Sequence, residues 1–157
     1  MLATAHRAGN VDDPDRLGML VELLLAVPDP LLLALHPRTR ERLERVSLLA
    51  PLEEGVTVTA PLGYVEMTAL LCNAKALLTD SGGLQKEAYI AGVPCVTLRP
   101  NTEWTETVEH GWNVIVDLDA ARAVAALERT PPVERPQLYG DGRAGERVVA
   151  ALTLHCR

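Results

Sequence analysis

Short, mostly continuous apolar runs alternate with longer amphipathic segments along the whole sequence. Runs of this kind are typical of strands that are buried on both faces of a sheet. Because helical segments separate the runs, the strands form βαβ units and lie parallel. The pattern therefore predicts a three-layer α/β/α domain with about six parallel strands. The predicted strands are 2–6, 31–35, 56–59, 76–79, 94–98 and 113–116.

Local signals mark the ends of the helices. Asp13-Pro14 supplies an N-cap followed by a proline in the first helical position. Gly92 is placed to end a helix at Ala91. With the strands, these helices predict a single Rossmann-like domain over residues 1–157. The predicted helices are 14–27, 37–46, 64–73, 84–91, a short segment ending at 111, 119–128 and 142–154.

The length and net charge of the chain limit the kinds of binding partner that can be expected. The chain has 157 residues and a net charge of −6, from 15 basic and 21 acidic residues. The length fits one domain with a full hydrophobic core. Nucleic acid is not expected as a partner, because binding a polyanion needs a basic surface. A single phosphate-containing ligand remains possible, since a few local donors are enough to bind it.

Cysteine spacing and hydropathy exclude further classes. Cys72, Cys95 and Cys156 lie far apart without a CxxC spacing, and the histidines are dispersed. This favours a cytoplasmic location and argues against a disulfide framework or a metal site. Charge and proline interrupt the most apolar stretch, 20–35, so no membrane association is expected. No cofactor is expected either.

Five loops that follow the predicted strands carry polar or small residues. In an open parallel sheet, ligands bind beyond the carboxyl ends of the strands. We therefore expect one site where these loops converge. The loops are 6–7, 36–38, 61–64, 80–83 and 99–103.

The segment TDSGGLQKE, residues 79–87, is the sharpest candidate. Gly82 and Gly83 allow a ligand to approach the backbone, and Ser81 adds a hydroxyl. The following helix would direct N–H groups and its dipole at an anion, and Glu87 could accept hydrogen bonds from a sugar diol. The alternative is a tight turn with Ser81 as N-cap. Both interpretations stay open at this point.

The other candidates also have structural alternatives. His6 and Arg7 follow the first strand and could donate to a diphosphate, or they could be a backbone-bonded histidine and a solvated arginine. His36 has the same two interpretations after the second strand. Met67 is typical of core packing, and residues 139–142 (YGDG) are typical of a turn before a helix.

Taken in order, these segments resemble the carboxyl-terminal half of the non-hydrolysing UDP-N-acetylglucosamine 2-epimerases. The resemblance covers essentially the whole chain, and its SGGLQ-E, TEW-E and YGDG stretches are together specific. It implies one half of a glycosyltransferase-B-like architecture, in which the nucleotide sugar lies between two Rossmann-like domains. The segments are HRAGNVD (6–12), HPRT (36–39), TDSGGLQKE (79–87), GVP (92–94), RPNTEWTE (99–106), GWN (111–113) and YGDG (139–142).

The resemblance also implies roles for individual residues. His6 and Arg7 match a pair at the cleft, near the diphosphate and the reacting sugar, and are the implied catalytic residues. The implied substrate-binding residues are Ser81, Gly82 and Gly83 for the diphosphate, Glu87 for the ribose hydroxyls, His36 on the nucleotide side (facing a regulatory substrate molecule in some bacterial members), Met67 beside the uridine, and Glu103.

The family reaction inverts C2 of the sugar by eliminating UDP to a 2-acetamidoglucal and adding it back to the other face. Its general acid and base lie in the amino-terminal half. That half is absent here, where the chain opens directly on a strand at Leu2. The resemblance therefore implies the UDP-binding half of a longer, homodimeric enzyme of cell-surface polysaccharide biosynthesis. Its ligands would be UDP-N-acetylglucosamine and UDP, and the chain alone would be inactive.

Three positions depart from the family pattern. Gly9 stands where the HR motif usually continues to a glutamate, and Trp104 stands where many members carry arginine. Lys86 replaces a frequent acidic neighbour of Glu87 and is expected to face solvent.

Other functions remain as alternatives. They are the donor-nucleotide domain of a glycosyltransferase-B-type glycosyltransferase, a hydrolysing epimerase, and a non-catalytic nucleotide-sugar binding module. A flavodoxin-like regulator is disfavoured, because no acidic cluster follows the first strand.

Overall fold

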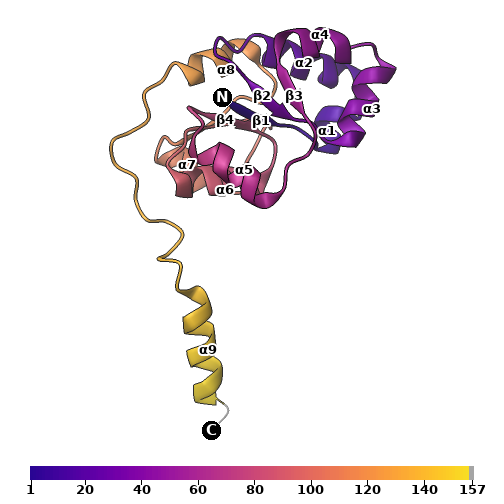
Figure 1. Ribbon diagram of the computed structural model, residues 1–157. Coiled ribbons are helices and arrows are strands. Elements are labelled where there is room, and N and C mark those ends of the chain that lie inside the picture. The colour runs from indigo at the N-terminus through magenta and orange to yellow at the C-terminus, as the bar shows by residue number, and fades with distance from the viewer. Residues whose placement is uncertain (156–157) are drawn as a thin grey trace.

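A six-stranded sheet with every neighbouring pair parallel forms the centre of the molecule, in the order β3-β2-β1-β4-β5-β6 (Figure 1). The computed structural model describes residues 1–155, so Cys156 lies outside the described residues. The strand order is that of a Rossmann-type sheet, and the predicted fold class is confirmed. The strands are β1 (Leu2–Thr4), β2 (Leu32–Ala34), β3 (Thr57–Thr59), β4 (Leu77–Thr79), β5 (Cys95–Thr97) and β6 (Asn113–Ile115).

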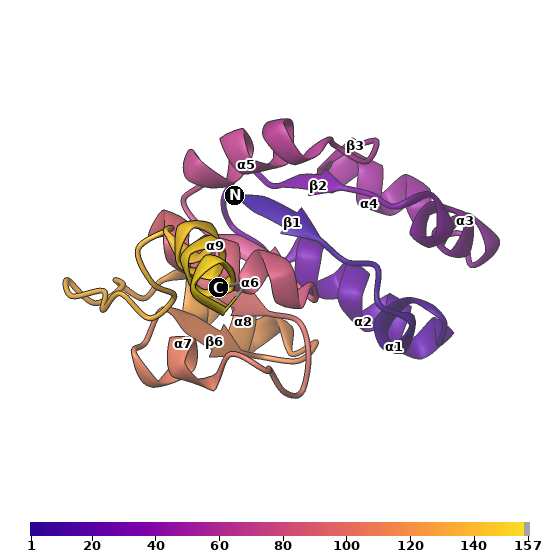
Figure 2. The same ribbon diagram turned by 90° about the horizontal axis from the view of Figure 1, so that it is seen from below.

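Helices connect the strands and cover both faces of the sheet, as Figures 1 and 2 show. The predicted signals start and end them: the Asp13 carboxylate accepts from the amides of Asp15 and Arg16, and Gly92 ends α6 with a φ of 74°. The helices are α1 (Ala8–Val11), α2 (Pro14–Leu25), α3 (Pro37–Arg45), α4 (Leu49–Gly55), α5 (Tyr64–Cys72), α6 (Gly82–Ala91), α7 (Thr105–Glu109), α8 (Ala120–Leu127) and α9 (Ala144–His155).

Strand register places the core on two faces. Ala3 is in register with Leu33 and Leu78, and Leu78 with Val96, so these side chains share one face and pack under α2, α4 and α8. Because successive strand residues point to opposite faces, the residues next to them cover the other face, under α5 and α6. Both faces are buried, which explains why the strands are continuous apolar runs.

Two helices, α1 and α4, were not predicted. Neither has a side-chain cap, since Arg7 and Leu48 stand at the N-cap positions. Pro51 resembles a helix breaker, but it lies in the first turn of α4, where its missing N–H would be unpaired anyway. Burial of Leu52 in the main core stabilises α4 instead of a local signal.

The last predicted helix is present as α9 but does not close the domain. Figure 1 shows it standing away from the sheet and its covering helices. Its residues from 144 to 154 are all exposed, including Val148, Val149, Leu152 and Leu154. The core of the domain is therefore complete without it.

The apolar stretch 20–35 divides between two elements, because α2 ends at Leu25 and β2 begins at Leu32. Within residues 1–155, no helix has the length and apolar character that crossing a membrane requires. Cys72 and Cys95 are free thiols. Burial raises the pKa of the Cys95 thiol to about 12.

Two residues of α2 test how the core is distributed. Leu23 is 0% exposed, whereas Met19 is 44% exposed on the same helix. We expect Leu23→Ala to lower the free energy of unfolding by about 2–5 kcal/mol, because it leaves a cavity in the main core. Met19→Ala should change it by less than about 1 kcal/mol. Urea denaturation followed by circular dichroism measures both, and equal effects would contradict this assignment of the core.

Candidate functional site

The five candidate loops meet at the carboxyl edge of the sheet, on either side of the β1–β4 pair. Chain connections run in opposite directions from these two strands, which opens a crevice at their carboxyl ends. The Thr4 and Thr79 hydroxyls are 2.8 Å apart and link the two strand ends. The convergence expected from the sequence is therefore present.

A buried carboxylate organises this edge. Asp80 is 0% exposed. One of its oxygens accepts from the backbone N–H of Arg7 at 2.9 Å, and both lie within 3.2 Å of the backbone nitrogen of His6. The His6 ring nitrogen Nδ1 is 3.5 Å from the other oxygen. Asp80 thereby fixes the turn that carries both predicted catalytic residues. The sequence placed it in a candidate loop without giving it a role.

Asn10, in α1, extends the same network. Its side-chain amide donates to Asp80 at 3.1 Å and to the Leu98 carbonyl at 2.7 Å. Its oxygen accepts from Arg16 at 3.0 Å, and Arg16 in turn pairs with Asp117. These contacts join the loops that follow β1, β4 and β5.

The turn at Gly82 and Gly83 begins α6. Ser81 is its N-cap, and the hydroxyl accepts from the Leu84 amide at a long 3.5 Å. Among residues 1–155, no acceptor engages the backbone N–H of Gly82 or Gly83. The N-cap interpretation is thus correct, and it leaves two amides directed away from the helix, as an anion would require.

Three charged side chains gather beside this turn. Arg99 donates two 2.9 Å hydrogen bonds to the two carboxylate oxygens of Glu103. The Arg7 guanidinium is 3.9 Å from Glu103. Hydrogen bonds from Arg99 lower the pKa of the Glu103 carboxyl to about 2, so this group is an anion at neutral pH.

His6, His36 and Met67 lie around an open cavity of about 210 Å³ at the same edge. The two imidazole rings are 6.4 Å apart between centroids. His36 is also the N-cap of α3, where its Nδ1 accepts from the Arg38 amide at 3.2 Å. Met67 packs against the smaller core cluster while it lines the cavity, so its structural and ligand-facing interpretations are compatible.

Glu87 lies one turn after Gly83 on α6 and is half-buried. Within the described part of the chain, its carboxylate forms no hydrogen bond or ion pair. Its place on α6 leaves it available to a ligand bound at the turn.

The loop from Arg99 to Trp104 is held against α6. The Trp104 indole donates to the Gly82 carbonyl at 2.7 Å, and the Thr102 hydroxyl donates to Gln85 at 2.5 Å. The expectation that Lys86 faces solvent is wrong. Its ammonium lies 4.8 Å from the Trp104 ring and 4.6 Å from the Tyr139 ring, because cations bind the faces of aromatic rings.

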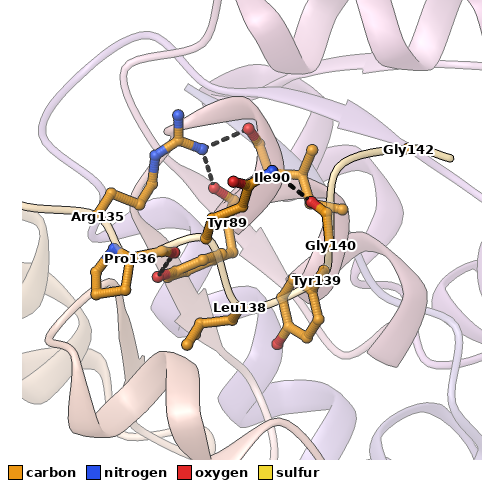
Figure 3. Close-up of a pocket in the computed structure, with 9 residues that line it drawn as sticks. Tyr89, Ile90, Arg135, Pro136, Leu138, Tyr139, Gly140 and Gly142 are labelled. Carbon is orange, nitrogen blue, oxygen red and sulfur yellow. Dashed lines mark hydrogen bonds between the residues drawn. The ribbon is translucent and has the colours of Figure 1, made fainter.

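Residues 134–140 lie across α6 on the side of these rings. Tyr139 stacks edge-on against Trp104, and its hydroxyl donates to Glu106 at 2.9 Å. Figure 3 shows Arg135 donating to the carbonyls of Tyr89 and Ile90, beside a second cavity of about 450 Å³. This cavity is larger, but its lining is mainly apolar or backbone and contains none of the predicted site residues.

Replacing Asp80 tests the network. In Asp80→Asn, an amide group would face N–H donors, so we expect the free energy of unfolding to fall by about 1–3 kcal/mol. The amides of His6 and Arg7 should also exchange faster with deuterium. Asp29→Asn is the matched control, because the exposed Asp29–Lys75 ion pair lies outside this network and should contribute at most about 1 kcal/mol. Equal losses in the two variants would contradict an organising role for Asp80.

Comparison with known proteins places this geometry in a family. The chain matches the family model described as UDP-N-acetylglucosamine 2-epimerase over residues 1–153. It is 46% identical over 97% of its length to the UDP-2,3-diacetamido-2,3-dideoxy-D-glucuronate 2-epimerase of Pseudomonas aeruginosa, of which it covers 44%. It is 40% identical, with the same coverage, to the UDP-N-acetylglucosamine 2-epimerase of Methanocaldococcus jannaschii.

Solved structures agree with the sequence comparison. The Methanocaldococcus jannaschii UDP-N-acetylglucosamine 2-epimerase, in a complex with UDP-N-acetylglucosamine and UDP, matches with a TM-score of 0.87 and 39% identity. The match covers 98% of this chain and 44% of that one. The chain thus spans a little under half the length of the relatives it matches. With the family model covering nearly every residue, the chain belongs to the UDP-N-acetylglucosamine 2-epimerase family.

Proposed function

We propose that this chain is the carboxyl-terminal, UDP-sugar-binding half of a UDP-N-acetylglucosamine 2-epimerase, which interconverts UDP-N-acetylglucosamine and UDP-N-acetylmannosamine. The whole of residues 1–157 would serve as one Rossmann-like nucleotide domain. The observation that carries the proposal is the pair of unengaged amides at Gly82 and Gly83, in the first turn of α6, directly after the buried Asp80. Such donors suit the diphosphate, because they stabilise the charge left on it when UDP is eliminated.

The predicted residues take consistent places in this proposal. Ser81, Gly82 and Gly83 would bind the diphosphate, and Glu87 would accept from the ribose hydroxyls. His6 and Arg7 would lie near the departing diphosphate. The cavity of about 210 Å³ lined by His36 and Met67 would receive the nucleoside.

Proton transfer at C2 is assigned to the half of the enzyme that precedes this chain. Two carboxylates beside the turn are already engaged, because Asp80 is buried among N–H donors and Glu103 is paired with Arg99, and the unengaged Glu87 is assigned here to the ribose. Neither is placed as a general base, which needs a free lone pair at the reacting carbon. A two-domain, glycosyltransferase-B-like enzyme supplies that group from the opposite wall of the cleft.

The setting of the full enzyme follows from the same resemblance. We place it in the cytoplasm, in line with the free thiols of Cys72 and Cys95, as a homodimer in cell-surface polysaccharide biosynthesis. Sedimentation of the full-length protein tests the dimer.

A second substrate is a specific candidate. The Pseudomonas aeruginosa relative, at 46% identity, is named for a diacetamido-glucuronate sugar instead of N-acetylglucosamine. Both are UDP sugars, so the nucleotide site described here would serve either. Assaying the full-length enzyme with both UDP sugars discriminates between them, since the sugar that is turned over identifies the activity.

Binding of UDP by the 157-residue chain tests the nucleotide site. We expect weak binding by calorimetry, and Glu87→Gln should weaken it about fivefold to tenfold, because a carboxylate is the stronger acceptor for a diol. Glu128→Gln removes the same charge at the exposed C-cap of α8 and should leave affinity unchanged. Equal affinities for wild type and Glu87→Gln would contradict the ribose assignment. Absence of UDP binding would contradict the proposed function.

Activity should require the other half of the enzyme. We expect no conversion of UDP-N-acetylglucosamine by residues 1–157 alone, because the acid and base are missing, and conversion once an amino-terminal domain of the family is joined. Nuclear magnetic resonance of the sugar anomeric protons follows the reaction. Turnover by the chain alone would contradict the assignment of the acid and base to the amino-terminal half. Free UDP released in step with turnover would favour the hydrolysing alternative.

A further inference from the structure

The position of the Glu103 carboxylate is unexpected for a group predicted to bind substrate. One of its oxygens lies 3.3 Å from where a Cβ on Gly82 would stand, and Arg7 Nη2 lies 3.8 Å from the same point. Glu103 therefore touches the first residue of α6, beside the turn assigned to the diphosphate. A carboxylate cannot donate a hydrogen bond, so it cannot bind phosphate oxygens directly.

The surroundings of Glu103 are those of a bound anion. Two nitrogens of Arg99 hold its oxygens, Arg7 faces it at 3.9 Å, and the positive end of the α6 dipole lies next to it. Arg99 is only 12% exposed and is held in place, whereas the Glu103 side chain is 54% exposed. A diphosphate at Gly82 and Gly83 would meet the same cations and the same helix end.

We propose that Glu103 is an internal anion that competes with the diphosphate for Arg7 and the amino-terminal end of α6. This inference rests on the proposed function, because it assumes that the diphosphate of UDP binds at this turn and displaces the Glu103 carboxylate. Its consequence is that Glu103 limits affinity for UDP instead of contributing to it.

Displacement requires little rearrangement. The Glu103 side chain is half-exposed and can turn toward solvent, and a diphosphate that takes its place beside Arg99 keeps the largely buried guanidinium paired. Within residues 1–155, the Arg7 guanidinium has Glu103 as its one ion-pair partner, at a distance too long for a direct hydrogen bond. Its donors are therefore available to an incoming phosphate, while the buried Arg99 keeps its position.

Calorimetry with UDP on the 157-residue chain tests the inference. Glu103→Gln keeps the size of the side chain and removes the charge, and we expect UDP to bind about threefold to tenfold more tightly at low ionic strength. At 1 M NaCl, where the screening length falls to about 3 Å, most of this gain should disappear. Glu103→Asp, which keeps the charge, should bind UDP much as wild type does.

Glu109→Gln is the matched control. Glu109 is exposed at the end of α7, so its replacement changes the net charge equally but should leave UDP affinity within about twofold of wild type. If wild type binds UDP and Glu103→Gln binds it equally or less tightly, the inference is overturned while the nucleotide site stands. If neither binds UDP, the proposed function fails, and the inference fails with it.

Discussion

Burial of the Asp80 carboxylate is the constraint on which the site depends. A carboxylate removed from water must be surrounded by donors, and here the donors are the amides of His6 and Arg7 and the side chain of Asn10. These partners are some 70 residues away in the sequence, in the loop after the neighbouring strand. Satisfying one charge therefore fixes the β1 loop against the β4 loop, and the same segment continues into the first turn of α6.

The hydrophobic pattern and the capping and turn residues predicted most of the fold and the location of the site. Continuous apolar runs gave the parallel sheet, and the rule that ligands bind at the carboxyl ends of strands located the crevice. Helices α1 and α4 were missed by the sequence analysis because neither has a capping side chain. Long-range hydrogen bonds from Asn10 to Asp80 and to the Leu98 carbonyl stabilise α1 instead. The role of Asp80 could not be predicted either, because two of its three hydrogen-bond donors are backbone amides, which leave no residue-specific signal in a sequence.

The aromatic residues are few, but the fold brings most of them together in one place. Only five stand in the chain, two Trp and three Tyr. Tyr89, Trp104, Trp112 and Tyr139 gather in one edge-to-face series along α6. Each uses its polar atom to hold a segment, and Trp104 holds the Gly82 carbonyl at the start of α6. Lys86 packs against two rings of this cluster. The sequence predicted a solvent-facing substitution at this position, whereas the side chain has a packing role.

The candidate site thus combines fixed backbone dipoles with half-exposed charged side chains, and the two have different physical properties. The amides of Gly82 and Gly83 belong to a helix end held by Trp104 and preceded by Asp80, so under the proposed function they would need no reorganisation when charge develops on a leaving diphosphate. The side chains of Arg7 and Glu103 are half-exposed and can exchange partners. Under the proposed function, the fixed dipoles would favour the transition state, whereas the exchangeable charges would set how tightly UDP is held before and after elimination. An epimerase of the proposed kind must retain UDP long enough to add it back, yet release it with the product, so the two contributions would need to be separately adjustable.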